Sequence, residues 1–162
     1  MFDFRYLTSI LGFVVLLHTG CTGTWAESGN TSDGQQWVAT TGHIADALRA
    51  ISSGTDSEVT ALCGPGMDPH SYAASTSDIS RMIKADAIFY NGFHLEAKLH
   101  ELLHDEFGDK SWSMASAFPE EAKLDWEEDG EVDSEAPFDP HIWNHLPAWA
   151  ECVEELVNQA GK

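Results

Sequence analysis

Hydrophobic residues recur along this chain in two alternating patterns. Short runs rich in β-branched and aromatic residues predict strands, and longer stretches with apolar residues three and four positions apart predict helices. One helix also has a start signal, because Ser75 is followed three residues later by Asp78, which is a variant of the capping box. The predicted strands are 37–41, 59–62, 87–90 and 112–115, and the predicted helices are 44–51, 75–85, 95–107 and 147–159.

The order of these elements predicts the fold class. Repeated strand and helix units imply an α/β fold, a parallel four-stranded sheet flanked by helices on both faces. In such sheets, ligands bind beyond the carboxyl ends of the strands. His43, His70, the pair Asn91-Gly92 and the segment leading to His141 all follow predicted strands. We therefore expect these residues to converge on one edge of the sheet.

Two loops carry the same tripeptide, Asp-Pro-His, at 68–70 and at 139–141. The proline fixes its own backbone angle and keeps the preceding Asp out of the helical region, so the His follows a stiff step of the chain. The Asp can accept a hydrogen bond from nearby backbone or from the far ring nitrogen of its His, which leaves the other nitrogen free for a metal ion. Two unrelated Asp-Pro turns are the alternative, because Asp-Pro is common in turns.

Four motifs, two of which contain these tripeptides, occur in a fixed order. They are Thr-Thr-Gly-His-Ile-Ala-Asp-Ala-Leu at 40–48, Gly-Pro-Gly-Met-Asp-Pro-His-Ser-Tyr at 64–72, Ala-Asp-Ala-Ile-Phe-Tyr-Asn-Gly-Phe-His-Leu-Glu at 85–96 and Asp-Pro-His-Ile-Trp at 139–143. Together they resemble the metal-binding receptors of manganese and zinc ABC importers, from about Trp37 to about Val157. The resemblance implies one lobe of a bilobal, periplasmic-binding-protein-like receptor, with an ABC permease as partner. It also implies that His70 and His141 are the imidazole ligands that this lobe gives to the metal.

The length of the chain limits how much of such a receptor it contains. With 162 residues and 43% hydrophobic content, it can bury one ordinary core but is short for two full domains. We expect residues 37–162 to be the N-terminal metal-binding lobe, with the C-terminal lobe absent. The remaining ligands would come from water or from a C-terminal lobe supplied in trans. Those ligands would decide between Zn²⁺ and Mn²⁺, so the sequence leaves the metal open.

Two other functions are compatible with the resemblance. The chain could be a surface lipoprotein or adhesin, a role sometimes assigned to family members, or a non-functional fragment of a receptor. Neighbouring ATPase and permease genes would favour the transport function over both.

The chain is strongly acidic, with a formal net charge of −19 from 27 acidic and 8 basic residues. This argues against nucleic acid as a partner, because neutralising phosphates requires Lys and Arg. It mildly favours the attraction of cations. Much of the acid lies in an insert at 120–138, where no helical or strand period is sustained, so we expect a solvated, mobile segment there.

The first 21 residues are typical of a secretion signal. The apolar run 6–17 is too short to span a bilayer comfortably. Cys21 is the candidate lipoprotein cleavage and lipidation site, and cleavage after Ala26 is the alternative. Residues 22–36, rich in Gly, Ser and Thr, are typical of a flexible tether. We expect an exported product, periplasmic or on the cell surface, with a lipid on Cys21 as its membrane anchor.

Three further histidines have weaker assignments. His43 occupies a loop position where the resembled family has an apolar residue, and it could lie near the metal. His94 begins a predicted helix and could cap that helix or bond Glu96. His145 receives no role from the sequence.

Two cysteines remain if Cys21 is lipidated. Cys63 and Cys152 would then be an even pair in an oxidising compartment. A disulfide between them and two buried free thiols are both compatible with the sequence.

The segment His100-Glu101-Leu102-Leu103-His104 matches the zinc-protease pattern. On a helix, the two imidazoles would share a face and grip zinc, and Glu101 would be the base that activates water. A protease also needs a third ligand downstream and a substrate cleft, and no motif here supplies either. The resemblance instead implies an ordinary surface helix, so we expect no enzyme.

Overall fold

Four short strands form the central sheet of the computed structural model, which describes residues 34–128, 131–132 and 137–160. They are β1 (Gln36–Ala39), β2 (Glu58–Ala61), β3 (Ala87–Tyr90) and β4 (Ser111–Ser113). Their spatial order is β2-β1-β3-β4 and every pairing is parallel. The predicted parallel four-stranded sheet is therefore confirmed. The leader and most of the tether lie outside the described residues, and the tether's last residue, Gln36, already belongs to β1.

Within the described ranges, three α-helices accompany the sheet: α1 (Gly42–Ile51), α2 (Thr76–Lys84) and α3 (Leu146–Ala160). The predicted capping box starts α2, because the Ser75 side chain accepts from the amide of Asp78 while the Asp78 carboxylate accepts from the amide of Ser75 at 2.9 Å. Among the described residues, no helix combines the length and apolar character needed to cross a membrane.

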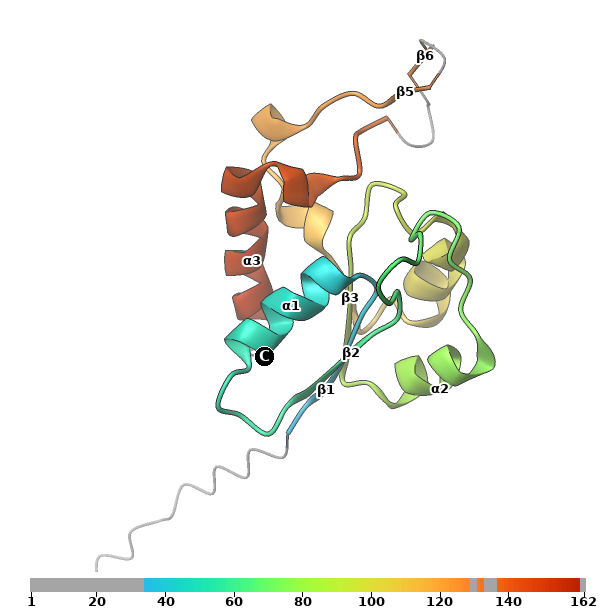
Figure 1. The fold of residues 1–162 in the computed structure, drawn as a ribbon, viewed down its shortest axis with the longest axis vertical. Coiled ribbons are helices and arrows are strands. Elements are labelled where there is room, and N and C mark those ends of the chain that lie inside the picture. Colours follow the sequence, from blue (N-terminus) through green and yellow to red (C-terminus); the bar gives the residue numbers. More distant parts are fainter. Residues whose placement is uncertain (1–33, 129–130, 133–136, 161–162) are drawn as a thin grey trace, which may run out of the picture. The chain divides into compact units, whose positions relative to one another are not determined.

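Alternation of side chains along the strands divides the core into two layers. Trp37 and Phe89 project toward α1 and α3, whereas Val38 and Ile88 project toward α2 and the irregular helical segment after β3. Figure 1 shows the helices on the two sides of the sheet. This burial fixes the strands, and it brings the loops that follow β2 and β3 to the same edge of the sheet.

The predicted helix at 95–107 is wrong as a continuous α-helix. Phe93 and His94 have positive φ angles of 50° and 59°, and a 3₁₀ turn at Ala97–Leu99 leads into a π-helical turn at Leu102–Glu106. The physical reason is Glu96, whose buried carboxylate reaches back to backbone amides at the end of β3 and turns the chain before a helix can begin. The fourth strand is also shorter than predicted, since a 3₁₀ turn follows it directly at Met114–Ala117.

The acidic insert contains more secondary structure than its sequence predicts. Its described part includes a 3₁₀ turn at Glu120–Ala122 and an antiparallel pair of two-residue strands, β5 (Glu127–Glu128) and β6 (Glu131–Val132). An isolated bridge joins Asp125, within the insert, to Phe138 at its end. Strands this short show no hydrophobic period, which is why the sequence does not reveal them.

Both described cysteines are buried free thiols, so the disulfide alternative is wrong. Burial raises the pKa of Cys63 and of Cys152 to about 11. Both thiols are therefore protonated at neutral pH and are poor nucleophiles and poor metal ligands. Cys21 lies outside the described residues.

Candidate metal centre

The two Asp-Pro-His loops meet, although their histidines are 71 residues apart in the chain. The Nε2 atoms of His70 and His141 lie 3.4 Å from each other, and their ring centroids are 5.5 Å apart. Two nitrogens bound to one tetrahedral zinc ion, each about 2.0–2.1 Å from it, lie about 3.3 Å apart. The structure thus brings together the two predicted ligands at a spacing that a single metal ion can bridge.

The loop of His141 has a defined ring orientation. The Oδ1 atom of Asp139 accepts the backbone amide of His141 at 2.9 Å and its ring Nδ1 at 2.6 Å. This second bond assigns the ring proton to Nδ1, so that Nε2 presents its lone pair toward His70. The sequence predicts that the Asp of this motif can accept a hydrogen bond from nearby backbone or from the ring of its His. Asp139 accepts both.

The loop of His70 shares the backbone turn but not the ring contact. Asp68 accepts the amide of His70 at 3.0 Å through Oδ1 and the hydroxyl of Ser71 at 2.7 Å through Oδ2. The Ser71 hydroxyl and then the His70 amide hold the pKa of Asp68 below its usual range. Asp68 and His70 are both exposed, whereas Asp139 and His141 are half-buried. The two halves of the centre therefore differ in how firmly they are held.

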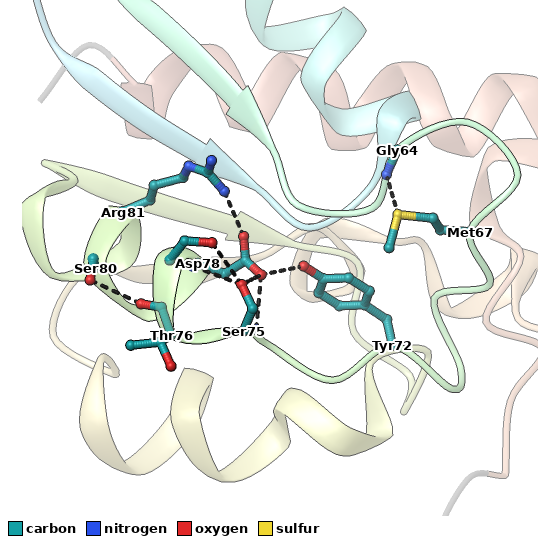
Figure 2. Close-up of polar contacts among 9 residues, drawn as sticks. Gly64, Met67, Tyr72, Ser75, Thr76, Asp78, Ser80 and Arg81 are labelled. Carbon is teal, nitrogen blue, oxygen red and sulfur yellow. Dashed lines mark hydrogen bonds and ion pairs between the residues drawn. The ribbon is translucent and has the colours of Figure 1, made fainter.

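A polar cluster around the buried Asp78 ties the His70 loop to α2. The hydroxyl of Tyr72 donates to Asp78 at 2.7 Å, and Figure 2 shows Ser75 and Arg81 converging on the same carboxylate. Burial alone would raise the pKa of Asp78, but the hydrogen bonds from Ser75, Tyr72 and Arg81 outweigh it and lower that pKa. The sequence indicates the cap on α2 but not this contact, which fixes the chain two residues after His70.

Aromatic rings surround His141. Trp143 packs edge-on against it with ring centroids 5.4 Å apart, and Trp126 lies 5.7 Å away. Trp143 also stacks on His43, with ring centroids 4.3 Å apart. His43 thus lies near the centre, as the sequence allows, but among the described residues it joins no group of three or more side chains that could hold a metal.

An open cavity of about 430 Å³ lies beside this stack. It runs between the start of α1 and the loop after β2, and its lining includes His43, Cys63, Met67 and Trp143. Trp143 both lines this cavity and contacts the ring of His141.

The histidines after β3 form a separate row on the surface. His94 stacks on His100 with centroids 5.2 Å apart, and His100 stacks on His104 at 5.6 Å. The three rings are nearly parallel, so their planes do not converge on one ion. Among the residues that the structure describes, no group of three or more His, Cys, Asp or Glu side chains could hold a metal. The bond to Glu96, one of the two roles that the sequence allows for His94, does not form, because Glu96 accepts its side-chain hydrogen bonds from other residues.

His145 caps α3, a role that the sequence does not indicate. Its Nδ1 accepts the amide of Ala148 at 3.2 Å, three residues into the chain that forms the helix. A ring nitrogen here satisfies one of the amides that a helix start leaves without a partner. The only sequence signal is its place directly before the helix.

The parallel α/β fold, with the two Asp-Pro-His loops meeting at one edge of the sheet, is that of one lobe of a bilobal solute-binding protein. Residues 38–162 match the sequence model of the ZnuA family, described as the periplasmic component A of a zinc-uptake complex, and the chain belongs to this family. The predicted resemblance is confirmed. Because the family consists of substrate-binding receptors rather than enzymes, the zinc-protease alternative at His100 and His104 is excluded.

Relatives of the chain differ in the metal they are named for. The manganese-binding lipoprotein MntA of Bacillus subtilis is 39% identical over 153 residues, covering 93% of this chain and 47% of MntA. The zinc-binding protein TroA of Treponema pallidum is 36% identical over 146 residues, covering 89% of this chain and 45% of TroA. The solved structure of periplasmic TroA superposes with a TM-score of 0.67 at 34% identity, covering 78% of this chain and 43% of that one. The chain spans about half the length of the curated relatives it matches.

Proposed function

We propose that the chain captures a divalent transition metal, Zn²⁺ or Mn²⁺, between His70 and His141 outside the cytoplasmic membrane, for delivery to the permease of an ABC importer. The observation that carries this proposal is the 3.4 Å separation of the two Nε2 atoms. The bond from His141 Nδ1 to Asp139 supports it, because it leaves Nε2 free for the metal. The relatives named for manganese and for zinc support the class of cargo.

The two imidazoles make half of a coordination shell. A tetrahedral ion bound by two nitrogens has two further positions to fill. We propose that water fills them in this chain, and that a C-terminal lobe supplied in trans fills them with protein ligands. Two nitrogen donors alone favour zinc over manganese, in keeping with the usual affinity order of divalent ions. The added ligands would then set the selectivity of the complete site.

We further propose that Cys21, which lies outside the described residues, carries the lipid that anchors the exported chain to a membrane. MntA is named as a lipoprotein. Metabolic labelling with a fatty acid should mark the parent chain but not Cys21→Ser, and Cys63→Ser should keep the label as the matched control. An unlabelled, released chain that begins at Glu27 would show instead that cleavage follows Ala26.

Zinc K-edge X-ray absorption tests the proposed ligands, because it counts the imidazoles around the bound ion. We expect two imidazoles with the remaining scattering from oxygen in the zinc-loaded chain, and one imidazole after His141→Ala. His100→Ala is the matched control and should leave the count at two. An imidazole count that falls in the control but not in His141→Ala would show that zinc binds elsewhere.

A further inference from the structure

We infer that Asn91 is a positioning residue, which holds His141 in the orientation that meets the metal. The inference rests on the proposed function and deepens it. Asn91 follows β3 directly and is 0% exposed. Its Nδ2 donates to the carbonyl oxygen of Pro140 at 2.8 Å, across 49 residues of sequence. That carbonyl belongs to the peptide bond that joins Pro140 to His141.

The orientation of the Asn91 amide is fixed by its acceptors. Nδ2 donates to the carbonyl of Gly92 at 3.0 Å as well as to that of Pro140. Two carbonyl oxygens require the NH₂ group on this side, and as a result Oδ1 of Asn91 is buried without a hydrogen-bond partner. A buried oxygen left unpaired is costly, and such a group calls for an explanation. The explanation is that this arrangement places a hydrogen-bond donor at the Pro140 carbonyl.

Asn91 is itself held rigidly by the ends of three strands. Its amide donates to Oε1 of the buried Glu96 at 2.8 Å, and Thr40, which follows β1, donates its hydroxyl to the same oxygen at 2.6 Å. The carbonyl of Asn91 accepts the amide of Ala115, which follows β4, at 2.9 Å. The position of the Asn91 side chain is therefore set by the sheet.

As a consequence, the half of the metal centre around His141 is fixed, and the half around His70 is adaptable. His141 is held by Asn91 through the preceding carbonyl and by Asp139 through its amide and ring. His70 is exposed, and the contact that ties its loop to α2 follows the histidine, through Tyr72. Asn91 thus acts on metal binding through His141 and not through His70.

Calorimetric titration of the exported chain with Zn²⁺ tests this role. Asn91→Asp keeps the shape of the side chain but turns an oxygen toward the Pro140 carbonyl. It should weaken zinc affinity by about 10–100-fold, the usual cost of losing a group that orients a metal ligand. The serine side chain of Asn91→Ser is too short to reach that carbonyl, so this variant should weaken zinc affinity similarly. It replaces Asn91→Asp in the test if Asn91→Asp fails to fold.

The matched control is Lys110→Met. Lys110 also donates to two backbone carbonyls, those of Ile83 and Ala85, each at 2.9 Å, but it lies at the opposite edge of the sheet. Its loss should lower thermal stability and leave zinc affinity unchanged. Equal losses of zinc affinity in Lys110→Met and Asn91→Asp would mean that any destabilised variant binds poorly, and would overturn the inference.

A double-mutant cycle separates positioning from general stability. In a His70→Ala background, the Asn91 substitution should still weaken zinc binding, whereas in a His141→Ala background it should add nothing. The same loss in both backgrounds, or no loss in a folded Asn91→Asp chain, overturns the role of Asn91. If His141→Ala itself leaves zinc affinity unchanged, the proposed function fails instead.

Discussion

Asp139 holds His141 by two hydrogen bonds to a single oxygen, one from the backbone amide at 2.9 Å and one from the ring Nδ1 at 2.6 Å. The corresponding oxygen of Asp68 accepts the amide of His70 and does not reach its ring. Two copies of the same tripeptide therefore give their histidines different hydrogen bonds. The difference arises because the His141 loop is packed against the sheet edge, while the His70 loop is exposed.

This difference predicts unequal effects of the two aspartates on metal binding. Asp139→Ala removes the bond that fixes the His141 ring and should weaken zinc affinity by about 10-fold or more. Asp68→Ala removes only a turn contact and should have a smaller effect. Calorimetry on both variants checks this, and equal losses would show that the ring contact has no influence on binding.

Gly92 should tolerate no side chain. Its φ angle is 89°, and an added Cβ would overlap the Ser113 hydroxyl and approach the Ala115 Cβ to 2.8 Å. Gly54 has nearly the same φ, 88°, with open space around it. Gly54→Ala should therefore cost about 1 kcal/mol of backbone strain. Gly92→Ala should cost clearly more, and thermal melts that rank the two variants in the opposite order would contradict the packing at the sheet edge.

The cap formed by His145 is expected to matter for stability and not for metal. His145→Ala should lower the free energy of unfolding by about 1 kcal/mol, because the amide of Ala148 loses its partner at the start of α3. Zinc affinity should be unchanged. A variant with parental stability but weakened zinc binding would place His145 in the metal centre instead.

Glu96 should make stability depend on pH. Burial raises its pKa, so the folded chain holds this proton more tightly than the unfolded chain does. The resulting stabilisation is fully present below the ordinary glutamate pKa of about 4.3 and is lost as the pH rises through the folded-state pKa. Glu96→Gln has no such proton. Urea unfolding from about pH 4 upward should show the free energy of unfolding of the parent falling relative to that of Glu96→Gln. A rise in the parent relative to Glu96→Gln would contradict the raised pKa of the buried Glu96.

The sheet and the pairing of the two histidines could be predicted because their signals are local. The strand at 87–90 has the predicted bounds, and α2 begins where Ser75 and Asp78 form the capping box. The repeated tripeptide, together with the rule that ligands bind at the carboxyl ends of parallel strands, predicts that His70 and His141 lie at one edge of the sheet.

The rest depends on side-chain contacts that leave no periodic signal in the sequence. The helix expected at 95–107 is broken because Glu96 bonds the end of β3, and no helical period reveals that competition. The bond from Asn91 to Pro140 spans 49 residues and becomes visible only once the fold is formed. The role of Tyr72 is hidden for the same reason, since its partner is fixed by the packing of α2.

The central claim is that His70 and His141 together bind the metal. It is tested most directly by titrating Zn²⁺ into three forms of the exported chain: the parent, His70→Ala with His141→Ala, and His100→Ala with His104→Ala. The control pair lies one turn apart in the surface histidine row, with ring centroids at 5.6 Å, close to the 5.5 Å of the proposed pair. We predict that zinc binding is lost in the first double variant and kept at parental affinity in the second. Parental binding after His70→Ala with His141→Ala, or its loss only in the surface pair, would contradict the account.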